Sequence, residues 1–178
     1  NTVSDAAADA APADAATLRT QPLASGLPQI PEGRTALIPA PAPEVTEKIH
    51  GEALPKRNGE ASPATIYAQR FVRTPEQKLL SFVVLDAGLS AQSLPLLMAL
   101  PKEVTLAFSP YSADAPERIA LFRKAGFEVW SMLPAQGTQY PQDDPGPLGL
   151  VANLPKDELM RRLRVVMAQG LGSVGLVL

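Results

Sequence analysis

The sequence contains no cysteine and a single histidine, His50, and each scarcity excludes a kind of chemistry. Without cysteine the chain forms no disulfide, no thiolate metal site and no cysteine nucleophile. His50 lies in a Pro/Ala-rich stretch, where we interpret it as a solvated residue. A Ser-His-Asp triad, a histidine-based zinc site and a histidine general base inside a folded domain are therefore excluded.

Long apolar runs and an excess of charge are also missing. No stretch approaches the ~20 apolar residues that cross a bilayer, and no charged-then-apolar signal precedes the expected domain. The formal net charge of -2 and the pI near 5.4 give no support for binding to nucleic acid or to an anionic membrane. Because the chain begins at Asn1 rather than Met, an export signal or a membrane anchor upstream of Asn1 is compatible with it.

Proline and alanine are plentiful in the first third of the chain, as in Pro39-Ala40-Pro41-Ala42-Pro43. Such a segment buries too little apolar surface to offset a backbone ordering entropy of roughly 1–2 kcal/mol per residue. We therefore expect residues 1–63 to be a disordered Pro/Ala-rich linker.

Residues 64–77 differ from this linker. Ile66, Tyr67, Phe71 and Val72 are spaced for one side of a short helix, and Pro75 ends the pattern. We expect a short helical lead-in that packs against the domain.

Residues 78–178 alternate strand and helix patterns. The expected strands are 79–85, 104–108, 127–133 and 173–178, and the expected helices run from Ser90 or Ser93 to about Leu100, from Asp114 to Gly126, and over 156–169. This βαβαβαβ order predicts an α/β domain with a parallel sheet and right-handed crossovers. Two architectures fit it, a small open sandwich or the first half of a truncated barrel.

Asp86 is the residue around which this domain is organised. An apolar strand ends at Asp86-Ala87-Gly88, and loops at the carboxyl ends of parallel strands carry the chemistry of α/β proteins. Asp143 and Asp144 follow in a long Pro-rich loop. They either cap turns there or, with Asp86, hold a hard cation such as Ca²⁺ or Mg²⁺, although nothing in the spacing requires an ion.

Two further motifs have simple interpretations. Gly170 to Gly175 matches G-x-G-x-x-G, but it leads from a helix into a strand, whereas a dinucleotide site needs the reverse order. We interpret it as a helix stop with a tight connection. Lys156, Arg161, Arg162 and Arg164 form a basic helix face, either a solvated surface balanced by Asp157 and Glu158 or a contact for an anionic polymer.

The residues from about Lys78 to Leu178 resemble roughly the first half of the divergent polysaccharide deacetylases of bacterial envelopes. The resemblance is carried by Leu85-Asp86-Ala87-Gly88-Leu89-Ser90, the stretch from Leu100 to Tyr111, Ala125-Gly126-Phe127-Glu128-Val129, Leu133-Pro134, and the stretch from Tyr140 to Pro147. It implies a distorted (β/α) barrel and a metal-dependent hydrolysis of N-acetyl groups on cell-wall or surface sugars.

This chain departs from the family pattern at the reactive positions. Asp86 keeps the acid that looks like a metal ligand, but Leu85 stands where the family has the acid that looks like the base. Met132-Leu133-Pro134-Ala135-Gln136 replaces the family's His-Leu-Pro-Met-Glu. The family's Asn-Asn-His would follow Val174-Gly175, where this chain reads Leu176-Val177-Leu178.

These departures predict a non-catalytic relative, exported to the bacterial periplasm, that binds an envelope glycan or an envelope protein without a cofactor. The expected binding residues are Asp86, Ser109, Tyr111, Tyr140 and Asp144. The alternative is an active deacetylase with part of its site outside this chain and with zinc or another divalent metal at Asp86. A third possibility is a second copy or another polypeptide that covers an exposed sheet edge.

Overall fold

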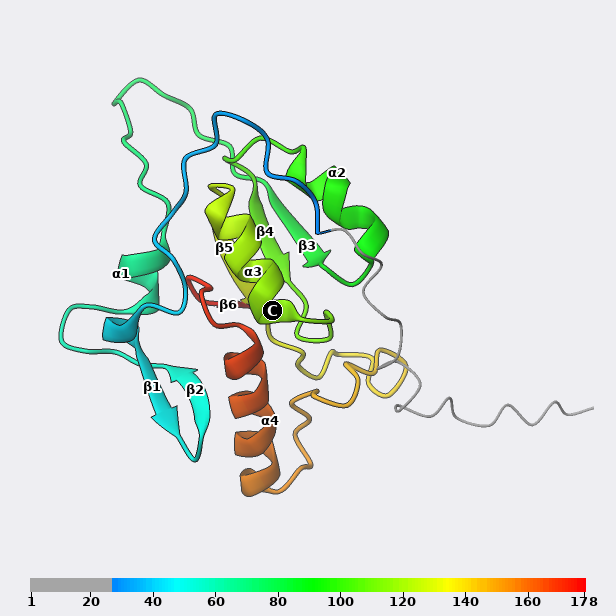
Figure 1. Cartoon of the computed structure of the whole chain (residues 1–178). Coiled ribbons are helices and arrows are strands. Elements are labelled where there is room, and N and C mark those ends of the chain that lie inside the picture. Colours follow the sequence, from blue (N-terminus) through cyan, green and yellow to red (C-terminus); the bar gives the residue numbers. More distant parts are fainter. Residues whose placement is uncertain (1–26) are drawn as a thin grey trace, which may run out of the picture.

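The structure is a computed structural model and describes residues 27–178. The prediction of a disordered linker over residues 1–26 lies outside the described residues. Within them, a four-stranded parallel sheet is ordered β3-β4-β5-β6 (Figure 1). Its strands are β3 (Val83–Ala87), β4 (Thr105–Phe108), β5 (Val129–Met132) and β6 (Leu176–Val177). The predicted α/β class with parallel βαβ units is confirmed.

Helices join the successive strands. They are α2 (Leu94–Met98), which follows the 3₁₀ turn η3 (Ala91–Ser93), α3 (Ala115–Lys124) and α4 (Lys156–Gln169). The bounds of α4 are those the sequence predicts. Gly170 ends α4, and Gly172 has a φ of 95°, so the helix-stop interpretation of the glycine motif is confirmed.

The main core lies between the sheet and the helices α2 and α3. Phe122 stands between Phe108 and Phe127, with ring centroids 5.4 Å and 5.7 Å away, and all three rings are fully buried. Tilted pairs at such distances stabilise a core beyond the apolar area they bury. This aromatic cluster fixes β4, α3 and β5 in one unit, which positions the carboxyl ends of these strands.

The prediction of a linker is wrong for residues 27–63. This segment forms η2 (Pro43–Val45) and a hairpin of β1 (Thr46–Ile49) and β2 (Glu52–Pro55), and β2 packs against α4 (Figure 1). The few apolar side chains of the segment are placed inward, because Ala42, Val45 and Leu54 are all buried. Composition alone did not predict this order, because a few buried side chains are enough to hold a Pro-rich segment against a folded domain.

One buried arginine of α3 takes part in that anchoring. Arg123, 1% exposed, donates hydrogen bonds from Nε and Nη2 to the Ile38 carbonyl at 3.2 and 2.9 Å. Its Nη1 donates to the Tyr67 carbonyl at 3.1 Å, and its guanidinium lies 4.5 Å from the centre of the Tyr67 ring. Arg123 therefore binds the segment before the sheet at two points, Ile38 and Tyr67, and holds both against α3.

The helical lead-in is shorter than predicted. Helix α1 (Pro63–Tyr67) begins at a capping box formed by Ser62 and Thr65, and Ala68 is already extended. Tyr67 is buried as expected, but Phe71 and Val72 are 66% and 86% exposed. The residues that follow α1 form a loop that projects away from the sheet (Figure 1).

Strand β3 is less buried than predicted. It begins at Val83 rather than at 79, pairs only with β4 among the described residues, and leaves Phe82 60% and Leu85 49% exposed. A parallel strand is buried when it has neighbours on both sides, and β3 is an edge strand here. That a second copy or another polypeptide covers this edge stays a prediction. No helix within residues 27–178 is long and apolar enough to cross a membrane.

Candidate functional site

Asp86 lies on the exposed end of β3, at a bulge between Val84 and Ala87. Its φ of 55° belongs to the left-handed region that non-glycine residues seldom adopt. The N–H of Asp86 donates to the Sδ of Met132, 3.1 Å away at the end of β5. The structure therefore brings together the two positions to which the sequence assigned a retained and a lost metal ligand.

Gln136, which the resemblance places at another replaced position, has a structural role. Its Oε1 accepts a hydrogen bond from the N–H of Ala152 at 2.8 Å, and its own N–H donates to the Leu150 carbonyl at 3.0 Å. The N–H of Leu150 donates to the Pro134 carbonyl at 2.8 Å. The two ends of the long loop after β5 are thus held together through Gln136.

These donors do not fit a divalent ion. A thioether such as Met132 is a poor ligand for a hard or borderline cation, and Leu85 offers no donor. Across residues 27–178, no group of three or more His, Cys, Asp or Glu side chains is placed to hold a metal. Asp86 meets Met132 through its backbone N–H, and this pair offers a divalent ion a thioether in place of an imidazole.

Ser109 belongs to the frame beneath this region. It is 3% exposed, its N–H donates to the Ala87 carbonyl at 3.1 Å, and its Oγ accepts from the N–H of Tyr111 at 3.3 Å. Close by, Ser112 and Arg118 both donate to the Gly88 carbonyl. Ser109 therefore supports the strand ends and presents no surface to a ligand.

Tyr111 fastens the long loop to the domain. Its hydroxyl donates to the Pro145 carbonyl at 2.7 Å and accepts from the N–H of Leu148 at 3.1 Å. Burial raises the pKa of the Tyr111 phenol, and Asp144 raises it further, while the Leu148 N–H and Arg162 oppose this rise. The phenol thus keeps its proton at neutral pH and acts as the donor to Pro145.

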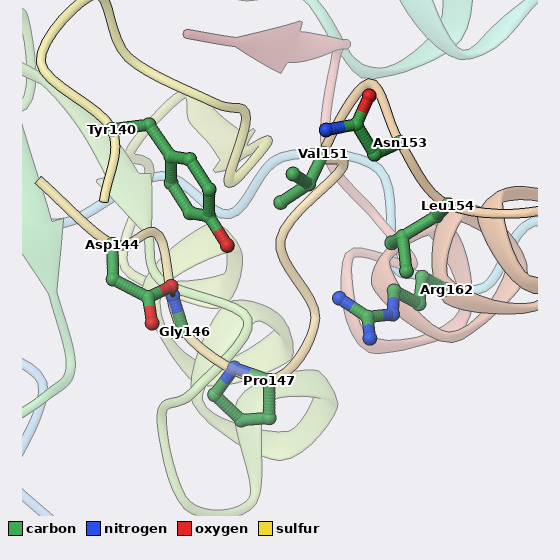
Figure 2. A pocket seen from close by; sticks show the side chains of 8 residues that line it. All are labelled: Tyr140, Asp144, Gly146, Pro147, Val151, Asn153, Leu154 and Arg162. Carbon is green, nitrogen blue, oxygen red and sulfur yellow. Dashed lines mark hydrogen bonds between the residues drawn. The ribbon is translucent and has the colours of Figure 1, made fainter.

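A pocket of about 430 Å³ lies where this loop meets the start of α4 (Figure 2). Figure 2 shows Tyr140 and Asp144 on one side, Asn153, Leu154 and Arg162 on the other, with Val151 between them. Pockets that bind small ligands have volumes in this range. Its lining residues are Tyr140, Asp144, Gly146, Pro147, Val151, Asn153, Leu154 and Arg162.

Comparison with known proteins identifies the relatives of this chain. A family model described as divergent polysaccharide deacetylase matches residues 82–177. The chain belongs to this family. A crystal structure of an uncharacterized protein from Agrobacterium tumefaciens is similar, with 29% identity and a TM-score of 0.58. The match covers 64% of this chain and 46% of that chain, so this chain spans less than half of the relative's length. No curated protein matches the chain.

Within this member of the divergent polysaccharide deacetylase family, the predicted binding residues separate into four places. Tyr140 and Asp144 share the pocket, Tyr111 holds the loop behind it, and Ser109 is buried. Asp86 does not line the pocket. The five residues do not line one pocket, and a binding role for the four exposed ones stays a prediction.

The two loop acids also make turn contacts. Asp143 accepts from the N–H of Gln139 at 3.1 Å, and Asp144 accepts from the N–H of Gly146 at 2.9 Å. The turn-capping interpretation is confirmed for both.

The sequence interpretation placed Arg162 on a basic helix face, either solvated or in contact with an anionic polymer, and did not predict that this residue lines a pocket. Its side chain is 19% exposed, against 58% for Arg161. Arg162 donates from Nε to Glu158 and from Nη1 to the Gly149 carbonyl, both at 2.7 Å. Local spacing gave no signal that separates the two arginines, because Arg161 and Arg162 lie three and four residues after Glu158 and both pair with it.

Proposed function

We propose that this chain is a non-catalytic member of its family that binds a glycan of the bacterial cell envelope. The supporting observation is the contact between Asp86 and Met132, in which a thioether occupies the place of the family's imidazole and accepts a backbone hydrogen bond. Leu85 occupies the place of the base. Loss of a general base alone lowers a rate by about 10²–10⁴.

The pocket beside the loop supports glycan binding. A tyrosine ring offers a flat apolar surface to a sugar ring, while Asp144 and Asn153 offer an acceptor and a donor to sugar hydroxyls. We propose that the protein acts in the periplasm, since envelope glycans are accessible there. Cell fractionation with antibody detection tests the location, and a purely cytoplasmic signal would contradict it.

The binding test uses isothermal titration of the full chain with soluble peptidoglycan fragments and with oligosaccharides of other surface polymers. We expect saturable binding that Tyr140→Ala weakens at least tenfold. Phe71→Ala is the matched control, because it also removes an exposed aromatic ring but lies outside the pocket. If no glycan binds, or if both variants weaken binding equally, the proposed site is wrong.

The catalytic test separates this proposal from an active deacetylase. We expect no acetate release from N-acetylated oligosaccharides when Zn²⁺ is supplied, and no zinc retained after gel filtration. Stoichiometric zinc together with acetate release, both lost in Asp86→Asn, would establish the enzyme instead.

A further inference from the structure

We propose that the pocket formed by Tyr140, Asp144, Asn153 and Arg162 recognises a sugar that carries a carboxylate, with Arg162 as the residue that selects it. This inference rests on the proposed glycan binding and specifies the class of glycan. It draws on three features of the pocket, which are the charge at Arg162, the rigidity of the walls and the separation of charge across the cavity.

The first feature is a net positive charge at one end of the pocket. Glu158 pairs with both Arg161 and Arg162, so the three side chains together carry one positive charge. The two arginines lower the pKa of Glu158 to about 2, so this carboxylate stays ionised at neutral pH. Among the lining residues, Arg162 is the single cation. A ligand with one negative charge matches this end of the pocket.

The second feature is that Arg162 is held in place. Its Nε and Nη1 are bound to Glu158 and to the Gly149 carbonyl, whereas Nη2 donates to no acceptor within residues 27–178. Figure 2 shows the guanidinium directed toward the pocket. A fixed guanidinium loses little freedom when it binds, so its remaining donors are well placed for a carboxylate oxygen.

The opposite wall is equally fixed. Tyr111 bonds to Pro145 and Leu148, and a Cβ added at Gly146 would lie 3.0 Å from the Tyr111 hydroxyl. The loop that carries Asp144 and Tyr140 therefore cannot collapse into the cavity without breaking these contacts. A preorganised pocket of this kind favours selective binding.

The third feature is the separation of charge. Asp144 stands on the Tyr140 side, opposite Arg162 (Figure 2). An acid at that end repels a second negative charge and accepts hydrogen bonds from hydroxyls. A hexuronic acid fits both ends, because its ring can lie against Tyr140 with its hydroxyls near Asp144 and its carboxylate at Arg162. A phosphate dianion fits less well, since the lining holds one cation and one acid.

The test varies the ligand and leaves the protein intact. Titration of the full chain with methyl glucuronide and with methyl glucoside, its carboxyl-reduced counterpart, compares the same sugar ring with and without a single carboxylate. We expect the acidic form to bind at least tenfold tighter at low salt, with the difference shrinking as salt is added. Equal affinity would overturn this inference and leave glycan binding in place, whereas the absence of binding by any glycan would overturn the proposed function as well.

Two variants locate the selecting residue. Arg162→Gln should remove the preference for the acidic form while retaining binding of the reduced form. Arg161→Gln is the matched control, since it also breaks a pair with Glu158 but does not line the pocket, and it should keep the preference within twofold. If Arg161→Gln also removes the preference, or if Arg162→Gln retains it while circular dichroism shows a folded protein, Arg162 does not select the ligand. Tight binding of short peptides through their terminal carboxylate would also contradict a sugar site.

Discussion

Replacing Arg123 by methionine should detach the segment that precedes the sheet from the body of the domain. Methionine keeps a similar length and an apolar stem, but it cannot donate hydrogen bonds. The Ile38 and Tyr67 carbonyls then lose their donors from Arg123, and the cation loses its contact with the Tyr67 ring. These contacts join parts of the chain 56 and 85 residues apart.

The magnitude follows from the contacts. The Tyr67 carbonyl, left buried without this donor, costs about 1–3 kcal/mol, and the part-buried Ile38 carbonyl costs less, about 1 kcal/mol. The cation–π contact adds about 1 kcal/mol. Burial lowers the pKa of Arg123, partly opposed by Tyr67 and Glu128, which shows that the buried cation has a desolvation cost that methionine avoids. We therefore expect Arg123→Met to lower the free energy of unfolding by about 3 kcal/mol.

Urea unfolding followed by Trp130 fluorescence measures this loss. Trp130 is the one tryptophan of the chain and packs against the cluster of Ala42, Val45 and Tyr67, so its emission reports on the docked segment. Lys124→Met is the control, because Lys124 is the exposed neighbour on the same helix. If the two variants unfold within about 0.5 kcal/mol of each other, Arg123 does not anchor the segment.

Three further predictions concern the loops and α4. Gly88→Ala should destabilise the protein by about 2 kcal/mol more than Gly59→Ala in urea unfolding, because both glycines have positive φ but only at Gly88 would the new Cβ collide with buried side chains. Tyr111→Phe should speed hydrogen exchange at the Leu148 amide and weaken glycan binding, and unchanged exchange would show that the hydroxyl does not hold the loop. The pKa of Glu158 is about 2 in the folded protein against an ordinary 4.5, so its contribution is present above pH 4.5 and is lost as the pH falls toward 2. Glu158→Gln should flatten the pH dependence of unfolding in that window, and an unchanged profile would contradict the pairing.

The local sequence pattern was sufficient to predict the helices and strands whose apolar residues recur with a clear helix or strand period. Helix α4 has the predicted bounds, and strands β4 and β5 lie within the predicted ranges. Asp114 marks the start of α3 as expected, but its side chain makes no capping bond, so the Asp-x-x-Glu spacing placed the boundary without forming the motif. Residue types at the ends of the elements therefore predicted where helices and strands begin and end, but they did not predict which side-chain hydrogen bonds form there.

Long-range contacts explain the errors. The hairpin and η2 lie in a Pro/Ala-rich segment whose order depends on α4 and on Arg123, residues far away in the sequence. Arg162 looked like one of several surface charges, and only its neighbours Gly149 and Glu158 show that it lies at a pocket. Neither fact can be deduced from local periodicity.

The sequence by itself determined the alternation of strands and helices and the membership in a family, and it predicted that Leu85, Met132 and Gln136 replace reactive side chains, because these depend on residue identity and local spacing. The tertiary structure decided that Met132 lies against Asp86, that residues 27–63 pack onto the domain, and that Tyr140, Asp144 and Arg162 share one pocket. Such juxtapositions depend on how distant elements pack, and packing is set by contacts that no local pattern encodes.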